Sequence, residues 1–239
     1  GNYQAALRSI TYHSTSEDPT ITSNSRTITW EVTDANSGGF GAESSSGVVS
    51  TINITPTIDK PVVTAGATLS YTEDDPSENH RAVIDNTITI TDDDDIELSG
   101  GIVTISSGIT TGDILTLTTQ NGISGTYDSS TGVLTIIGTA SNGNYQAALR
   151  SITYHSTSED PTITSNSRTI TWEVTDANSD GAGVGISSSV TSTITIIATN
   201  DKPVISVNNI SFTENSSAAI IDNTISVNDS DDSQLSGGT

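Results

Sequence analysis

The acidic residues are the groups in this chain best suited to chemistry, and they occur in clusters. Asn86–Gly101 reads NTITITDDDDIELSGG, so a run of β-branched residues ends in four consecutive aspartates, Asp92–Asp95. Two like charges about 5 Å apart repel by roughly 0.8 kcal/mol even in water, and by more at a lower dielectric constant. The sequence therefore predicts either that a cation lies beside these carboxylates or that the segment stays loose and solvated.

Other carboxylates flank expected strands in a fixed order along the chain. Glu73 stands in YTEDD, Asp176 in VTDANSDG, and Asn200 and Asp201 in NDKP, whereas SEDP (158–161) precedes a strand that contains a tryptophan. Ca²⁺ binds six to eight oxygens, at about 2.3–2.6 Å, from carboxylates, amides, backbone carbonyls and water. Loops that meet at the end of a β-sandwich, together with a linker, can supply such a set, so Ca²⁺ is the expected ligand. The alternative is that these loops are solvated and serve to keep a β-rich array soluble.

The segments between the acidic loops alternate apolar and polar residues, as half-buried β-strands do. RTITWEVTD places Ile170, Trp172 and Val174 on one face, and its duplicate is expected to bury Trp30 in the same way. NYQAALRS (144–151) predicts one short helical turn, because Tyr145, Ala148 and Leu149 share a face. Many short strands separated by turn signals predict an all-β fold, a Greek-key β-sandwich of the immunoglobulin type. The other residues expected on buried faces are Leu115, Leu117, Leu134, Ile136, Ile152, Tyr154 and Ile194.

Much of the chain is an internal duplication. Residues 1–37 recur without a change as residues 143–179, an offset of 142, which persists from IDKPVV (58–63) to NDKPVI (200–205). Further on, IDNTITITDDDDIELSGG is matched by IDNTISVNDSDDSQLSGG at an offset of 137. A period of this length is the size of a domain, so each repeat is expected to have its own core. The expected domains are the C-terminal part of one repeat (1–58), a complete repeat (59–200) and the N-terminal part of a third (201–239).

The composition excludes several classes of partner and of chemistry. The 239 residues carry a formal charge of −22 and include neither Cys nor Met. This acidity argues against nucleic acid and anionic membranes as partners, since both require a cationic surface. The lack of Cys excludes disulfides and thiol chemistry, and no apolar run approaches the ~18 residues of a membrane span. The lack of Cys also fits an extracellular protein that gains its rigidity by means other than disulfides.

The order of the acidic motifs resembles a known calcium-binding pattern. D-x-D, then VTDANSDG, then a strand rich in Thr, Ser, Val and Ile, then NDKP is similar to the pattern of cadherin repeats. It resembles still more the cadherin-like, immunoglobulin-like tandem repeats of giant bacterial adhesins of the repeats-in-toxin type, in which such residues bind Ca²⁺ at the junction between consecutive domains. The resemblance implies that a first junction uses Asp59, Asp92, Asp94 and Asp176. It implies that a second junction uses Glu73, Asn200, Asp201, Asp229 and Asp231.

The chain also departs from that family pattern. The first linker has Ile58 where the second has Asn200, which removes one oxygen ligand, and SEDP stands in the place of a D-R-E triplet. Asp93 and Asp95 are expected to be spectators, because strand alternation points them away from their neighbours. The weaker metal candidates are Asp34, Glu159 and Asp160.

Three functions remain open from the sequence. The first is a structural extender repeat of a long secreted or cell-surface adhesin, in which Ca²⁺ shared by neighbouring repeats fixes their angle. The second is a module that binds a glycan or another surface ligand. The third is a subunit of an extracellular filament, in which identical chains complete each other's partial repeats by strand exchange. An enzyme is not expected, because no G-x-S-x-G elbow accompanies the Ser, His and Asp residues, and two Trp and two Phe are too few to line a sugar cleft.

Overall fold

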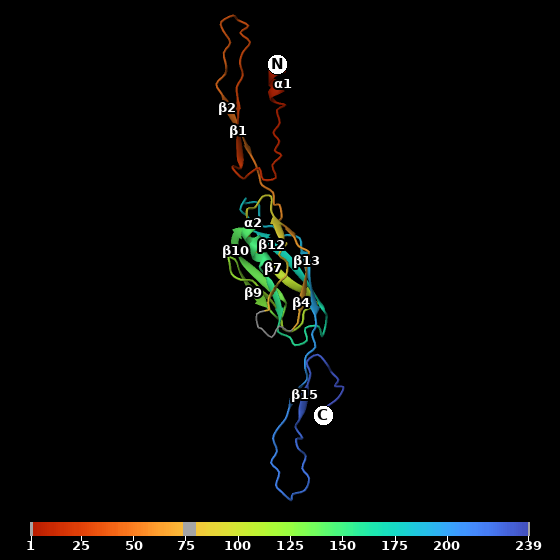
Figure 1. Cartoon of the computed structure of the whole chain (residues 1–239). Coiled ribbons are helices and arrows are strands. Elements are labelled where there is room, and N and C mark those ends of the chain that lie inside the picture. The colour runs from red at the N-terminus through yellow and green to blue at the C-terminus, as the bar shows by residue number, and fades with distance from the viewer. Residues whose placement is uncertain (1, 74–79, 239) are drawn as a thin grey trace.

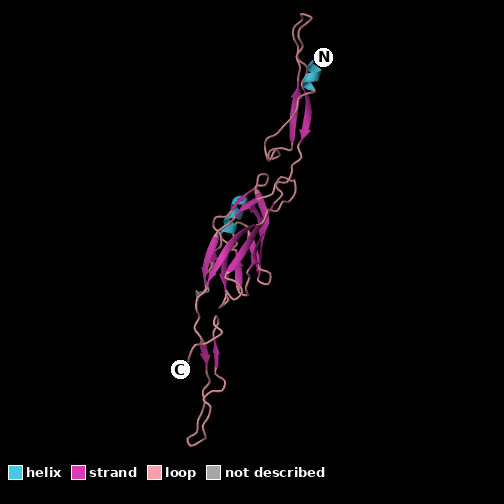
Figure 2. Cartoon of the chain, turned by 90° about the vertical axis from the view of Figure 1, so that its right-hand side faces the viewer, coloured by secondary structure: helices cyan, strands magenta, loops and turns pink. Residues whose placement is uncertain are grey.

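The computed structural model describes residues 2–73 and 80–238, which form three bodies in a row (Figures 1 and 2). A central domain, residues 59–200, lies between two thinner arms. The N-terminal arm comprises residues 2–58 and the C-terminal arm residues 201–238, and the arms extend from opposite ends of the central domain. Every residue of the hydrophobic core lies between Val63 and Ile196, so the core belongs to the central domain alone.

Strands dominate all three bodies. The N-terminal arm contains α1 (Asn2–Leu7), β1 (Ser25–Trp30) and β2 (Val48–Asn53), and the C-terminal arm contains β14 (Val204–Ser206) and β15 (Ser226–Asn228). The central domain contains β3 (Val62–Thr64), β4 (Thr68–Thr72), β5 (Ala82–Val83), β6 (Thr89–Thr91), β7 (Glu97–Ser107), β8 (Asp113–Thr116), β9 (Ser124–Asp128), β10 (Val133–Ser141), α2 (Asn142–Arg150), β11 (Thr153–Ser156), β12 (Ser167–Asp176) and β13 (Val190–Ile197).

The central domain is a two-layered β-sandwich. One layer is a six-stranded sheet in the order β4-β13-β12-β7-β10-β9, antiparallel except for the parallel pair of β4 and β13. The other layer consists of the sheet β5-β11-β8 and the pair β3-β6. Both layers contribute side chains to one core, and Tyr71 of β4 meets Tyr154 of β11 edge to face, with ring centroids 4.9 Å apart. The predicted all-β fold, with two packed layers of sheet around one core, is confirmed.

Strand β12 shows why the alternation in the sequence identified the core. Its residues are alternately half-buried and buried along the whole strand, and Ile170, Trp172 and Val174 are fully buried, as predicted. The Trp172 indole satisfies its N–H group by donating to Ser192 Oγ on β13 (3.0 Å). The other predicted core residues are buried as well: Leu115, Leu117, Leu134, Ile136, Ile152, Tyr154 and Ile194.

Helix α2 packs on the end of the sandwich that carries the acidic loop. Ser141 is its N-cap and accepts the Asn144 amide (3.3 Å). The helix runs for nine residues, longer than the predicted turn, and buries Tyr145, Ala148 and Leu149 as predicted. Gln146 Oε1 accepts the Ile90 amide (3.2 Å), and Arg150 Nε donates to the Ile88 carbonyl (2.6 Å). These bonds fix the segment around β6, the strand that precedes Asp92–Asp95.

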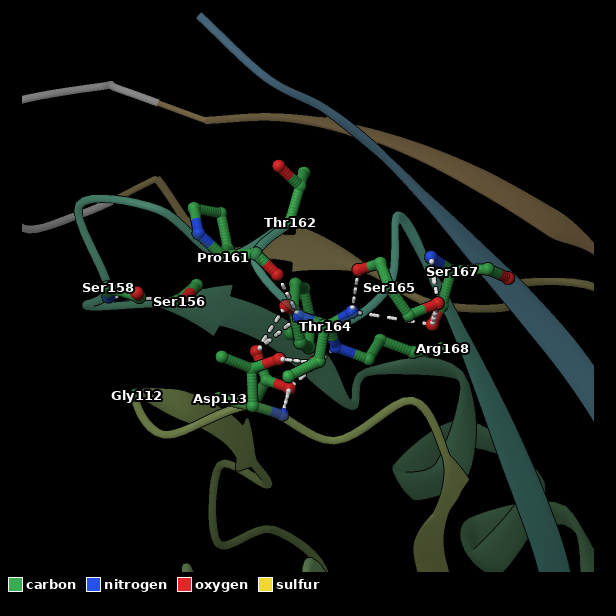
Figure 3. Close-up of polar contacts among 12 residues, drawn as sticks. Gly112, Asp113, Ser156, Ser158, Pro161, Thr162, Thr164, Ser165, Ser167 and Arg168 are labelled. Carbon is green, nitrogen blue, oxygen red and sulfur yellow. Dashed lines mark hydrogen bonds and ion pairs between the residues drawn. The ribbon is translucent and has the colours of Figure 1, made fainter. Parts of the chain in front are cut away.

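A charged pair lies inside the sandwich (Figure 3). Arg168 is on the buried face of β12, in register with Ile170, and its Nε lies 2.6 Å from Asp113 Oδ2 at the start of β8. The Tyr154 hydroxyl donates to Asp113 Oδ1 (2.6 Å), and Arg168 Nη2 donates to the Pro161 carbonyl (2.6 Å). Arg168 therefore holds the SEDP loop against the edge of the second layer. Burial, followed by the Asp113 charge, raises the pKa of the Tyr154 hydroxyl.

The N-terminal arm corrects one prediction. Trp30 donates to Ser50 Oγ (2.8 Å), as Trp172 does to Ser192, but Trp30 is only half-buried. The expectation that Trp30 is buried like its duplicate is therefore wrong. The physical reason is that the described arm offers only the β1-β2 hairpin and α1, with no second sheet to cover the indole.

Candidate metal centre

The aspartate run is a bend between β6 and β7. Asp92 Oδ1 accepts the amides of Asp94 (3.4 Å) and Asp95 (3.1 Å), which turns the chain immediately after β6. Because the segment is not a strand, its side chains do not alternate. Asp94 and Asp95 are both buried, whereas Asp93 is exposed. The prediction that Asp95 points away from its neighbours is therefore wrong, and the same expectation for Asp93 agrees with its exposure.

A second loop, residues 176–185, meets this bend. The Asp176 carboxylate is fully buried at the end of β12 and accepts the amides of Gly185 and Asn178. Asp95 Oδ1 accepts both the amide and the hydroxyl of Ser179, which joins the two loops. Asp180 Oδ1 accepts the Ala182 amide (2.8 Å). These bonds place Asp180 on the side of the loop that faces the bend.

Together the two loops form an acidic cluster at the first junction. One carboxylate oxygen from each of Asp94, Asp95 and Asp180 lies within 4.8 Å of the other two. Three buried carboxylate oxygens in these two loops have no hydrogen-bond donor, namely Asp92 Oδ2, Asp94 Oδ1 and Asp180 Oδ2. The linker joins the cluster through its backbone, since the Asp59 amide donates to Asp94 Oδ2 (2.8 Å).

The structure thus brings together the predicted set Asp59, Asp92, Asp94 and Asp176, and adds two residues that sequence reasoning missed. Asp180 stands in the quoted VTDANSDG, and its position directly before a glycine in a turn was a usable signal. Asp95 gave no such signal, because its direction depends on the bend made by Asp92.

The cluster perturbs its own ionisation. Burial, followed by the interaction with Asp94, raises the pKa of the Asp92 carboxyl from 3.8 to about 7. Burial also raises the pKa of Asp176, and the charges of Asp95 and Asp94 add to this rise against the lowering effect of the two amides. Both shifts have the sign expected where carboxylates are packed together without enough positive charge.

The N-terminal arm contributes to the same place. A cavity of about 190 Å³ lies between the arm and the central domain, lined by Asp18, Thr20, Ile21, Asp94, Ile96, Ser179 and Asp180. Asp18 Oδ1 accepts the amide (2.9 Å) and hydroxyl (3.0 Å) of Thr20, and this turn presents the loop to the cavity. Asp18 is the duplicate of Asp160, so the SEDP aspartate of one repeat faces the acidic cluster of the next.

The second junction repeats the contacts of the first. The Asp201 amide donates to Asp231 Oδ2 (3.1 Å), as Asp59 does to Asp94, and the Asp232 amide donates to Asp229 Oδ1 (3.2 Å), as Asp95 does to Asp92. Carboxylate oxygens of Asp229, Asp231 and Asp232 lie within 4.8 Å of one another. The amide hydrogen bond from Asp201 is the main cause that lowers the pKa of Asp231.

Glu73 and the second linker also lie together. Glu73 is buried at the end of β4, and its Oε2 accepts the Thr199 amide (3.2 Å), one residue before Asn200. Asn200 Nδ2 donates to the Asp201 carbonyl (2.6 Å). The residues predicted for the second junction therefore lie close together. Glu73 contacts the linker at Thr199, and the linker contacts Asp231 through the Asp201 amide.

The weaker candidates lie outside both clusters within the described part of the chain. Asp34 Oδ1 accepts the Asn36 amide (2.9 Å) and Asp160 Oδ1 the Thr162 amide (3.0 Å), so each closes a local turn, and Glu159 is exposed. Asp34 duplicates Asp176, but Gly38 stands where Asp180 stands in the complete repeat. Neither described helix has the length and hydropathy of a membrane span.

No protein-family model matches the chain. Halomucin of Haloquadratum walsbyi is 36% identical over 110 residues, which are 44% of this chain and 1% of that protein. Among solved structures, the chain is similar to protocadherin gamma B7 extracellular cadherin domains 1–4 (TM-score 0.33, 15% identity, 86% of this chain and 41% of that one). It is also similar to human CDH23 EC21-23 (TM-score 0.33, 14% identity, 87% of this chain and 58% of that one). The chain thus spans only a small part of its curated relative, and the sandwich assignment rests on the sheet topology described above.

Proposed function

We propose that this chain is an extender segment of a long extracellular adhesin of the repeats-in-toxin type, stiffened by Ca²⁺ bound where consecutive repeats meet. The observation that carries the proposal is the set of buried, donor-free carboxylate oxygens on Asp92, Asp94 and Asp180. Burying charge without compensation is costly, so such oxygens are expected to bind a cation. The match to about 1% of Halomucin supports membership of a very long polypeptide.

The donor set favours Ca²⁺ over other metals. Both clusters consist of carboxylates, and neither contains His or Cys, which Zn²⁺ prefers. Mg²⁺ demands a near-octahedral shell and keeps several waters, whereas Ca²⁺ accepts many oxygens in flexible geometry. The residues that would hold the ion at the first junction are Asp92, Asp94, Asp95 and Asp180, with Asp59, Asp176 and Asp18 beside them.

The ion would act by joining two bodies. Asp94, Asp95 and Asp180 repel one another by roughly 0.9 kcal/mol per pair at 4.8 Å even with the dielectric constant of water. A dication cancels this repulsion. Because Asp18 of the arm lines the same cavity as Asp94 and Asp180, a cation there is shared by both bodies. The angle between consecutive repeats would then be fixed, and the array would resist bending.

Thermal unfolding and small-angle scattering test the proposal. At a Ca²⁺ concentration about 100 times the Kd, linkage adds about 2.7 kcal/mol, so Tm should rise by about 5–10 °C over the value in chelator. Asp94→Asn and Asp180→Asn should abolish most of this rise. Asp93→Asn removes the same charge from an exposed site in the same bend and should leave the rise intact.

An unchanged Tm in Ca²⁺, or an equal effect of all three variants, would contradict the proposal. The scattering curve gives an independent readout, since Ca²⁺ should narrow the distribution of molecular lengths. No specific observation favours a glycan ligand or catalysis, and the proposal assigns the chain neither.

A further inference from the structure

The first linker carries an apolar residue at the point where the second linker carries an amide. Ile58 directly precedes Asp59, and its counterpart Asn200 directly precedes Asp201. Asn200 turns back on its own linker, since its Nδ2 donates to the Asp201 carbonyl (2.6 Å). The side chain of Ile58 has no polar group to satisfy in this way, so its position depends on the atoms against which it packs.

Two glycines of the loop 176–185 form the surface on which Ile58 lies. A Cβ atom added to Gly183 would lie 2.6 Å from Ile58 Cδ1, and one added to Gly185 would lie 3.2 Å from Ile58 Cγ2. A side chain at position 183 would therefore displace Ile58, and one at position 185 would crowd it. Ile58 covers the two glycines closely and is 44% exposed overall.

Hydrogen bonds inside the loop hold this glycine surface in place. The Gly185 amide donates to Asp176 Oδ2, and the Asp176 amide donates to the Gly185 carbonyl (3.1 Å). The Gly183 amide donates to Asn178 Oδ1 (2.7 Å). A Cβ atom on Gly185 would also lie 2.7 Å from Asp176 Oδ2, so the absence of a side chain there admits both the carboxylate and the linker.

The preceding repeat has a different loop at the same place. By the offset of 142, Gly183 corresponds to Gly41, whereas Gly185 corresponds to Glu43. A glutamate in the place of Gly185 would direct its Cβ atom at the aspartate and at the linker, so a loop of that sequence is unsuited to an isoleucine. The match between Ile58 and Gly185 is therefore specific to the complete repeat.

We propose that Ile58 is a positioning residue for the first junction, which fastens the linker to Gly183 and Gly185 whether or not a cation is bound. The next residue shows the consequence, because the Asp59 amide donates to Asp94 Oδ2 (2.8 Å) in the acidic cluster. A linker held by Ile58 presents this amide to Asp94 before any ion arrives. The angle between the N-terminal arm and the central domain is then restricted even in chelator. The apolar contact does not depend on the calcium proposal.

Distance measurements between two spin labels in chelator test the proposal. The chain has no cysteine, so Thr51→Cys in β2 and Thr135→Cys in β10, both at exposed positions, place one label on each side of the junction. The wild-type linker should give a narrow distribution of distances. Ile58→Ala removes most of a side chain that is 44% exposed, so open orientations should become about tenfold more populated and broaden the distribution. Ile58→Val keeps most of the contact and should keep the distribution narrow.

Ile58→Asn separates packing from metal ligation, because it copies the residue of the second linker. If the position acts through its contact with the glycines, this variant should broaden the distribution in chelator as Ile58→Ala does. It should also weaken Ca²⁺ binding in a calorimetric titration, because the linker is no longer held beside the acidic cluster. If the position instead provides an oxygen ligand, the variant should bind Ca²⁺ more tightly than the wild type, and the proposal is overturned.

Val184→Ala is the matched control, because Val184 stands between the two glycines in the same loop and is 57% exposed. It removes apolar atoms from the loop but leaves Ile58 and both glycines in place, so the distribution should match that of the wild type. A distribution for Ile58→Ala no broader than that of the wild type, or an equal effect of Val184→Ala, would overturn the proposal. A lack of Ca²⁺ binding would contradict the calcium proposal alone, since the distances in chelator decide this one.

Discussion

Replacing Asp113 by Asn tests whether the repeat depends on its buried charge pair. Arg168 is fully buried, its Nε lies 2.6 Å from Asp113 Oδ2, and the Tyr154 hydroxyl and the Thr110 amide donate to the same carboxylate. The variant keeps the shape of the side chain but leaves a buried guanidinium without its counter-charge, which costs about 3–5 kcal/mol. A domain is typically stable by about 5–15 kcal/mol, so the substitution should remove much of the total.

The duplicated sequence supplies an internal control. Arg26 has the same sequence neighbours as Arg168 and donates to the Pro19 carbonyl (2.6 Å) as Arg168 does to Pro161, but it is half-buried and, within the described residues, no carboxylate pairs with it. Arg26→Met should therefore change the free energy of unfolding by less than about 0.5 kcal/mol. The double substitution D113L/R168M removes both charges and should restore most of the loss from Asp113→Asn.

Urea unfolding at saturating Ca²⁺ measures these differences. Trp172 fluorescence reports on the central domain once the other tryptophan is replaced by Trp30→Phe. A loss below about 1 kcal/mol for Asp113→Asn, or a loss for Arg26→Met as large as that for Arg168→Met, would refute the reasoning. In the first case the Asp113–Arg168 pair would add little to stability. In the second case the hydrogen bonds from the arginine to the backbone carbonyls, and not the Asp113 carboxylate, would hold the SEDP loop.

Three further predictions concern the acidic bend, a turn and the core. In chelator, the free energy of unfolding should fall as the pH rises from 3.8 through about 7, because the folded state holds the Asp92 proton more tightly than the unfolded state does. Urea titrations at pH 5 and pH 8 measure this fall, and saturating Ca²⁺ should make it smaller. Gly108→Ala should lower the free energy of unfolding by about 2 kcal/mol or more, since φ is +76° and the new Cβ would clash with the Ser167 carbonyl of β12. Gly122→Ala, with φ +79° and open space around the new Cβ, should cost only about 1 kcal/mol, and differential scanning calorimetry will compare the two variants. Trp172→Ala should cost about 3–5 kcal/mol and Trp30→Ala far less, because only the first indole is buried, and urea unfolding followed by circular dichroism will separate them.

The sandwich was predictable because its strands carry a strict alternation. RTITWEVTD assigns a face to every residue of β12, and that register also places Arg168 on the buried side with Ile170. Its partner could not be found in the same way. Asp113 is 55 residues away on another layer, and no local pattern links it to β12. Long-range polar pairs are thus visible in the sequence only as one charged residue in an apolar register.

The acidic cluster at the first junction shows a different limit of prediction from sequence. The order of the acidic motifs correctly grouped Asp92, Asp94 and Asp176 at one place, because loops at the same end of a sandwich meet. The direction of each carboxylate was set by side-chain hydrogen bonds to nearby amides, and these end the strand alternation after β6. Asp95 was misassigned for that reason, and the contribution of Asp18 depends on how the arm meets the central domain.

The duplicated segments show which features of the fold depend on the local sequence and which depend on other parts of the chain. Residues 2–37 and 144–179 have the same sequence and form the same local contacts, such as the Asp18 and Asp160 turns onto Thr20 and Thr162. The side chains that are buried in the copy 144–179 are not buried in the copy 2–37, because the residues that cover the second copy come from 59–142. The hydrogen-bonded framework is therefore specified within each segment, while the core arises only when the front and back parts of a period meet.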